Sequence, residues 1–125
     1  MTKKEIANKY IEFLSNGNVE KVVSLFAENG KVHSPIYGEK SAAKFYETLN
    51  EDTVDSELKI KGIFEDSDTQ NIALYFEYIW TMKSGKIVTF DVVDIVEFNN
   101  QNKISELRII YDTVLSRKLV EEMKK

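Results

Sequence analysis

Two long stretches of alternating residues, on either side of a Ser84-Gly85 pair, constrain the fold more than any other feature of this sequence. At residues 74–82, every second residue is apolar or aromatic, and this alternation predicts a strand with one buried face. Residues 88–98 alternate in a similar way. Because a glycine-containing turn between two such stretches is typical of a β-hairpin, the sequence predicts a long antiparallel pair.

The N-terminal part carries a different periodicity, in which apolar residues recur three and four positions apart. This spacing predicts three amphipathic helices, each with one apolar face. Their apolar residues are Ile6, Tyr10, Phe13 and Leu14; then Val19, Val22, Val23 and Phe26; then Ala42, Phe45, Tyr46 and Leu49. Gly17 can end the first helix in the left-handed conformation, and Asn18 can cap the second. We expect the second helix to end near Gly30, followed by an extended piece at residues 31–34.

The sequence after the third helix predicts a meander of strands. Alternation at residues 58–64 and 107–111 adds two strands to the hairpin. A short last helix is predicted by the spacing of Leu115, Leu119 and Met123.

Helices and strands are thus segregated along the chain, which is typical of the α+β class. A curved sheet with helices on one side leaves a concavity between them, where small-molecule sites are commonly found. The length of 125 residues suits one domain. We therefore expect a single domain over residues 1–125, with a curved, mostly antiparallel sheet and helices on its concave side that form a cone-shaped pocket.

Composition excludes several kinds of site. The chain has no cysteine and one histidine, His33, so we expect no disulfide, no thiol nucleophile, no metal and no cofactor. A formal charge of −4 and an isoelectric point near 5.1 argue against nucleic acid as a partner. No stretch approaches the ~18 apolar residues of a membrane span. The N-terminus also lacks a signal-peptide apolar run, so we expect a cytoplasmic protein that does not bind membranes.

Asp94 is the residue that departs from the apolar pattern of its strand. It is in phase with Val88, Phe90, Val92, Val96 and Phe98. A carboxyl on a buried face is costly unless it is protonated, paired with a cation or hydrogen-bonded. Apolar surroundings raise the pKa of such a carboxyl, and its protonated form can donate a hydrogen bond to an oxyanion. Because perturbed groups often mark functional sites, Asp94 is a candidate site residue.

The alternative role for Asp94 is a structural ion pair with Arg108, and strand register decides between the two. If the turn at residues 99–102 sets Asp94 opposite Leu107, Arg108 points to the other face. A slip by one residue would place Arg108 opposite Asp94. The first register fits the sequence better, because Leu107 and Ile109 then lie on the face of Asp94.

Aromatic residues on the predicted inner faces are further candidates. Tyr10 and Tyr46 lie on the apolar faces of the first and third helices, where each is either a core residue or a hydrogen-bonding group of the pocket. Trp80 and Tyr111 are interpreted as core or pocket lining. The alternative is that aromatic side chains fill the pocket themselves, namely Phe76, Tyr78, Trp80 and Phe90.

Four segments carry a family resemblance: KYIEFLSNGNVEKVVSLFAENGKVHSPIYG, KFYETL, VVDIVEF and KISELRIIYD. Together they resemble ketosteroid isomerases and the wider nuclear transport factor 2-like superfamily, which includes SnoaL-type polyketide cyclases. The resemblance covers nearly the whole chain and implies a cystatin-like α+β barrel. It says much less about the reaction, because one fold hosts many activities.

The resemblance implies roles for three residues. Tyr10 falls on the catalytic tyrosine of the family, Tyr46 on its supporting tyrosine and Asp94 on its protonated aspartic acid. In ketosteroid isomerase, a tyrosine and such a neutral carboxyl form the oxyanion hole. The implied role of Asp94 therefore coincides with its unusual place in the strand pattern.

Ser34 departs from the family, because it stands where the isomerases have the aspartate that acts as general base. A serine does not accept a proton near neutral pH as a carboxylate does, so the resemblance does not imply the proton shuttle of the isomerases. Neighbouring strand residues point to opposite faces, so His33 and Ser34 cannot both face the pocket. Glu39, further along the loop, is the other candidate base.

We expect a SnoaL-like pocket protein that binds an apolar small molecule whose carbonyl, enol or phenol oxygen is held by Tyr10 and Asp94. The expected supporting or lining residues are Tyr46, Ser34, Trp80, Phe90, Leu107 and Tyr111. As an enzyme it would transfer a proton next to a carbonyl, in isomerase, cyclase or dehydratase chemistry. The alternative is a non-catalytic ligand-binding or dimerisation module. A homodimer is expected in either case, through an outer sheet face that carries Ile87, Val93, Ile95 and Ile110.

Overall fold

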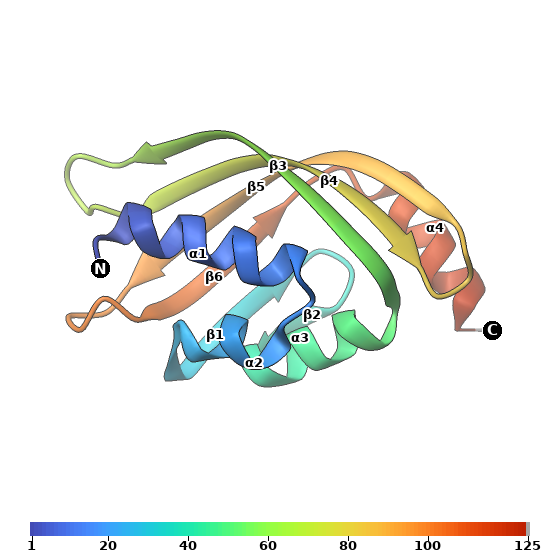
Figure 1. Ribbon diagram of the computed structural model, residues 1–125, viewed down its shortest axis with the longest axis horizontal. Helices are drawn as coiled ribbons and strands as arrows, with labels where there is room; N and C mark the ends of the chain where they lie inside the picture. The colour runs from blue at the N-terminus through green and yellow to red at the C-terminus, as the bar shows by residue number, and fades with distance from the viewer. Residues whose placement is uncertain (125) are drawn as a thin grey trace.

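The computed structural model describes residues 1–124, in which a curved sheet is covered by helices on its concave side and at one end (Figure 1). The helices are α1 (Lys3–Ser15), α2 (Val19–Ser24), α3 (Ala42–Glu51) and α4 (Val114–Met123). The strands are β1 (Phe26–Ser34), β2 (Gly38–Ser41), β3 (Thr53–Glu65), β4 (Ile72–Met82), β5 (Ile87–Phe98) and β6 (Ile104–Ile110). The predicted α+β class is confirmed.

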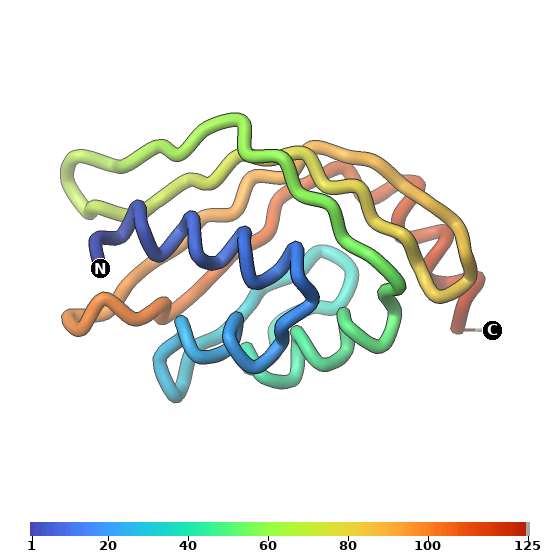
Figure 2. Tube along the Cα trace, in the orientation of Figure 1, coloured from blue at the N-terminus to red at the C-terminus, as the bar shows by residue number. Residues whose placement is uncertain are grey.

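The six strands form one sheet in the order β2-β1-β6-β5-β4-β3. All neighbouring strands are antiparallel except β1 and β6, which run parallel. Figure 2 shows the long strands arching over α1, which packs against β3 and β4. The sheet does not close into a complete barrel, since β2 and β3 form its two edges.

The β4–β5 hairpin follows the predicted pattern. Gly85 in its turn has a φ of +87°, which glycine adopts without steric cost. In β4, every second residue from Ile72 to Met82 is buried, and Asp94 of β5 is buried in the same way as its apolar neighbours. One face of the hairpin therefore contributes to the core, as the alternation predicts.

The break between the first two helices also forms as predicted. Gly17 adopts a φ of +68° just after α1, and the side chain of Asn18 accepts a hydrogen bond from the backbone N–H of Lys21 at 3.1 Å. The left-handed glycine and the N-cap reverse the chain between α1 and α2.

The predicted length of the second helix is wrong. Helix α2 ends at Ser24, and Phe26 begins β1 instead of continuing the helix. The backbone N–H of Ile104 donates to the carbonyl of Leu25, and Phe26 pairs with Ile104, so pairing with β6 outweighs the helical spacing. At Gly30 a Cβ atom would lie 2.9 Å from the Ile104 carbonyl oxygen, so this close approach requires glycine.

The last helix is present, and Leu119 and Met123 pack against the core as predicted, but Leu115 does not. Ser116 and Val120 are buried, whereas Leu115 is 53% exposed. The guanidinium of Arg117 donates a hydrogen bond to the carbonyl of Pro35, and this contact ties α4 to the loop between β1 and β2. Tertiary contacts thus set the rotation of the helix about its axis.

Two features of the sheet were not predicted. The short strand β2 forms a hairpin with β1, so the helical first third of the chain also supplies two strands. In β3 the pairing shifts between Ile60 and Gly62, and Phe64 is 60% exposed. The irregularity breaks the alternation of β3, so its apolar residues do not all face the core.

Candidate functional site

A narrow cavity lies between the concave face of the sheet and helices α1 and α3 and is partly open to solvent. About 40 Å³ of it can hold the centre of a water-sized sphere. Its lining residues are Tyr10, Leu14, Ser34, Tyr37, Phe45, Leu49, Phe76, Tyr78, Trp80, Phe90, Val92, Asp94, Ile109 and Tyr111. Most are apolar or aromatic, as is usual for small-molecule sites. The structure thus brings Tyr10, Ser34 and Asp94 to one cavity.

Asp94 lies in an apolar part of this wall. Asp94 is 1% exposed, and it pairs across the sheet with Leu74 on β4 and Ile109 on β6. Among residues 1–124, no hydrogen-bond partner is present for Oδ1 of Asp94. Burial raises the pKa of this carboxyl well above its usual range, because desolvation penalises the charged form. The neutral acid has a proton to donate.

The strand register excludes the ion pair as the role of Asp94. Asp94 pairs with Ile109, not with Leu107 as predicted, and Leu107 pairs with Val96. The difference is two residues, which leaves the same side chains on the same face. Arg108 pairs with Ile95 and is exposed on the opposite face. Leu107 is fully buried in the core and is absent from the cavity lining described for residues 1–124, so its predicted lining role is wrong.

Tyr10 and Tyr46 form a buried pair of phenols. Their hydroxyl oxygens lie 2.6 Å apart, and both residues are 2% exposed. Burial raises the pKa of both, because desolvation penalises the charged phenolate form. Tyr10 lines the cavity, whereas Tyr46 lies on a smaller hollow beside α2. Tyr46 therefore contacts Tyr10 from behind the cavity wall.

Aromatic side chains make up much of the remaining wall. Phe90 and Tyr111 are stacked with ring centroids 4.5 Å apart, and Tyr78 lies 5.5 Å from Phe90. Burial raises the pKa of Tyr78 to about 12, although its hydroxyl bonds to Ser56 at 2.7 Å. Trp80 donates its ring N–H to Thr53 at 2.8 Å. These bonds hold the rings in place and leave the cavity narrow but not filled.

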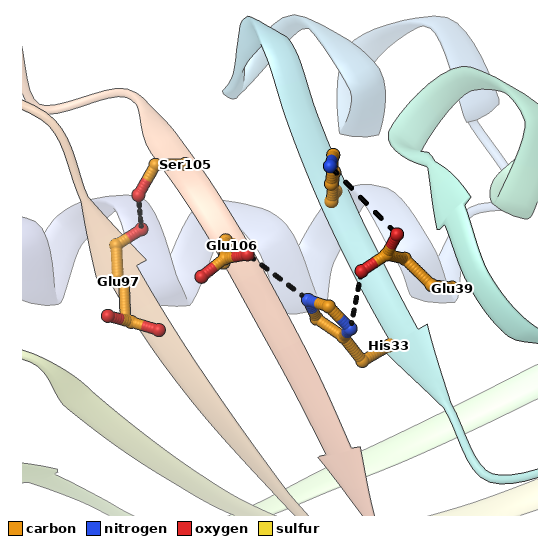
Figure 3. A network of polar contacts seen from close by, with 6 residues as sticks. His33, Glu39, Glu97, Ser105 and Glu106 are labelled. Atoms are coloured by element: carbon orange, nitrogen blue, oxygen red, sulfur yellow. Dashed lines mark hydrogen bonds and ion pairs between the residues drawn. The ribbon is translucent and has the colours of Figure 1, made fainter.

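Ser34 and His33 face opposite sides of β1, as predicted from strand alternation. Ser34 lines the cavity, and its Oγ accepts hydrogen bonds from the backbone N–H groups of Ile36 and Tyr37, both at 3.2 Å. Figure 3 shows His33 on the other side, between two glutamates.

Glu39, the remaining candidate base, is one of the two glutamates that contact His33. Nε2 of His33 lies 3.2 Å from Glu106, and Nδ1 lies 3.4 Å from Glu39. Glu39 is also 3.9 Å from Lys31. Glu39 is therefore engaged on the outer side of β1 rather than in the cavity.

A second buried carboxyl, Asp52, was missed by the sequence analysis. It is 5% exposed and accepts a hydrogen bond from the hydroxyl of Tyr37 at 2.6 Å. Nζ of Lys124, just after α4, contacts its other oxygen at 2.5 Å. Asp52 caps the end of α3, where helical periodicity stops, so no pattern in the sequence indicates its burial.

Residues 1–124 contain no cluster of three His, Cys, Asp or Glu side chains suited to a metal ion. No helix within the same range is both long enough and apolar enough to cross a membrane.

Comparison with known proteins identifies the family. The model of the SnoaL-like domain matches residues 7–107, and the chain therefore belongs to the SnoaL-like family. A search of curated proteins finds no significant match.

Solved structures show the same fold at low sequence identity. An NTF2-like protein of unknown function from Burkholderia pseudomallei is 15% identical with a TM-score of 0.82, over 96% of this chain and 98% of that one. TerC, co-crystallised with polyporic acid, is 17% identical with a TM-score of 0.79, over 95% and 98%. SalBIII, an epoxide hydrolase/cyclase-like enzyme of pyran ring formation in salinomycin, is 16% identical with a TM-score of 0.74, over 88% and 90%.

Proposed function

We propose that the cavity binds an apolar small molecule through a carbonyl, enol or phenol oxygen, with Asp94 and Tyr10 as hydrogen-bond donors. The observation that carries this proposal is the buried Asp94 carboxyl in an apolar cavity wall, with no partner for Oδ1 among residues 1–124. A buried polar atom without a partner is costly, and a ligand oxygen would remove that cost. The same arrangement would stabilise negative charge that develops on the ligand oxygen.

As a reaction we propose proton transfer next to a carbonyl, in an isomerase, cyclase or dehydratase reaction. Water or a basic group of the ligand would accept the proton, because the lining described for residues 1–124 holds no imidazole and no carboxyl besides Asp94. Tyr10 and Asp94 would stabilise the enolate, and Tyr46 would orient the Tyr10 hydroxyl. The cyclase-like SalBIII and the polyporic acid complex of TerC support a small organic ligand, although these relatives share only the fold.

We also propose that the protein acts in the cytoplasm.

A fluorescence titration tests the binding site, because Trp80 is the only tryptophan and lines the cavity. A series of substituted phenols should change the Trp80 emission on binding. Asp94→Asn should weaken binding about 10-fold, because an amide is a poorer donor than a carboxylic acid, and Tyr10→Phe should have an effect of similar size.

Matched controls come from the outer face of the same strands. Asp91→Asn on β5 and Tyr75→Phe on β4 change the same chemical groups outside the cavity lining, so they should leave binding within about twofold. No binding by the wild type, or equal losses in the Asp94 and Asp91 variants, would refute the proposal.

Activity requires a separate test, because Ser34 stands where the isomerases have their base. Isomerisation of a β,γ-unsaturated ketone should be slow in the wild type and faster in Ser34→Asp, since the carboxylate supplies the missing proton acceptor. No gain in rate would argue against isomerase chemistry in this cavity.

The second candidate function is a non-catalytic binding or dimerisation module. The outer face of the sheet carries exposed apolar residues, since Ile87 is 63% and Ile110 is 51% exposed. Val93 and Ile95 lie on the same face of β5, and Val93 pairs with Ile110. We propose a homodimer through this face, which light scattering would detect and Ile110→Lys would disrupt.

A further inference from the structure

The hydroxyl of Ser34 has its acceptor capacity already in use. A serine hydroxyl offers one donor and two lone pairs. Oγ of Ser34 accepts from the backbone N–H of Ile36 and from that of Tyr37, both at 3.2 Å. The Ser34 hydroxyl can therefore only donate a hydrogen bond to a group in the cavity.

Ser34 and Asp94 lie on one row across the sheet. Along the parallel pair, His33 is level with Arg108, so the next residue, Ser34, comes level with Ile109. Ile109 in turn pairs with Asp94. Two strand spacings of ~4.8 Å place the Cα atoms of Ser34 and Asp94 about 10 Å apart. Both residues line the cavity on the concave side, where curvature of the sheet brings side chains closer together.

The wall between these two residues is apolar. Ile109 lies between Ser34 and Asp94 on the same row, and the stacked rings of Phe90 and Tyr111 lie beside it in the lining. A space with a hydrogen-bond donor on each side of an apolar strip fits a ring that carries one acceptor oxygen on each side. The spacing suits two oxygens separated by the width of a single ring.

Resting on the proposed function, we propose that Ser34 determines specificity by donating a hydrogen bond to a second oxygen of the ligand. The site then selects flat, apolar compounds with two acceptor oxygens, such as cyclic dicarbonyls, over compounds with a single carbonyl. In this role Ser34 binds the ligand and accepts no proton from it.

Two probes that differ by one carbonyl test this proposal: N-methylphthalimide, with two carbonyl oxygens, and N-methylisoindolin-1-one, with one. Binding of each would be measured by Trp80 fluorescence in the wild type and in variants. Ser34→Ala should weaken the dicarbonyl probe about fivefold, the loss expected for one neutral hydrogen bond, and change the monocarbonyl probe less than twofold. Ser34→Thr retains the hydroxyl and should preserve the preference for the dicarbonyl probe.

The ratio of the two affinities separates specificity from a structural effect. Loss of the two backbone hydrogen bonds in Ser34→Ala could loosen the loop, but that would weaken both probes equally and would overturn the proposal. Ser105→Ala on the outer side of β6 is the matched control and should change neither probe.

The Asp94→Asn variant separates a failure of the role of Ser34 from a failure of the proposed function. If it weakens both probes while Ser34→Ala leaves their ratio unchanged, the role of Ser34 is refuted and the proposed function stands. If neither probe binds, or binding does not depend on Asp94, the proposed function fails and the role of Ser34 fails with it.

Discussion

Asp52 and Asp94 are both buried carboxyls close to the cavity, yet their surroundings differ completely. Asp52 accepts a hydrogen bond from Tyr37 and contacts Lys124, so both of its oxygens have partners. Asp94 is more deeply buried, and its Oδ1 has none among residues 1–124. Burial alone thus does not distinguish a structural carboxyl from a candidate functional one, whereas hydrogen-bond partners do.

The partners of Asp52 join three parts of the chain that are distant in sequence. Tyr37 belongs to the β1–β2 loop, Asp52 to the end of α3 and Lys124 to the end of α4. Within residues 1–124, Asp94 joins no such segments, and it lines the cavity instead. We therefore expect substitutions of Asp52 to lower stability, and substitutions of Asp94 to change ligand binding while raising stability at neutral pH.

The largest expected effect is a pH-dependent gain in stability on Asp94→Asn. Burial raises the pKa of Asp94 in the folded state, so above its ordinary pKa the folded protein binds more protons than the unfolded chain. Wild-type stability then falls as pH rises toward the folded-state pKa, by at most about 1.4 kcal/mol per pH unit from this group. The amide cannot ionise, so the difference between variant and wild type should grow in favour of the variant.

Urea denaturation of both proteins between pH 4 and pH 8 measures this difference. Asp91→Asn, on the exposed outer face, is the matched control. A difference between Asp94→Asn and wild type that stays constant with pH would show that Asp94 ionises normally in the folded protein.

The next effect in size is a loss of stability in Asp52→Ala. The substitution leaves the Tyr37 hydroxyl without its acceptor and removes the contact with Lys124, so we expect a loss of about 2–3 kcal/mol. Thermal unfolding followed by circular dichroism would show it. Asp55→Ala, a nearby exposed position on β3, should have little effect. An unchanged melting temperature in Asp52→Ala would contradict the structural role of Asp52.

A smaller loss is expected for Tyr37→Phe, which keeps the ring in the cavity wall and removes only the hydroxyl. Because Asp52 retains Lys124, the loss should be about 1–2 kcal/mol. The double variant with Asp52→Ala should lose less than the sum of the two single losses, since both remove the same hydrogen bond. Strict additivity would show that the two groups act independently.

The smallest effect is expected for Lys124→Met. The Lys124 side chain is 53% exposed, so its ion pair with Asp52 is screened by solvent and contributes about 0.5 kcal/mol. Added salt should reduce the difference from wild type further. A loss larger than that of Tyr37→Phe would reverse this order and make Lys124 the main partner of Asp52.

The hairpin and the position of Asp94 were predictable because both follow from local alternation and a glycine turn. The end of α2 was not, because Phe26 satisfies helical spacing and is drawn into β1 by a distant strand. The pairing of Asp94 with Ile109 depends on a shift in register between Glu97 and Phe98, and no residue type at these positions predicts that shift. Asp52 gave no signal, since its partners lie 15 and 72 positions away.

The parallel pairing of β1 with β6 has a consequence for how this chain is made. Val32 cannot pair with Leu107 until β6 has been synthesised and has left the ribosome, long after β1. Until then β1 and β2 lack β6, the strand that joins them to the rest of the sheet. Pairing β1 with β6 also closes a long loop, and the entropy cost of that closure comes before the contacts form. Folding to completion is therefore a late event, and before β6 is available one edge of β1 is unpaired and exposed to association with other chains.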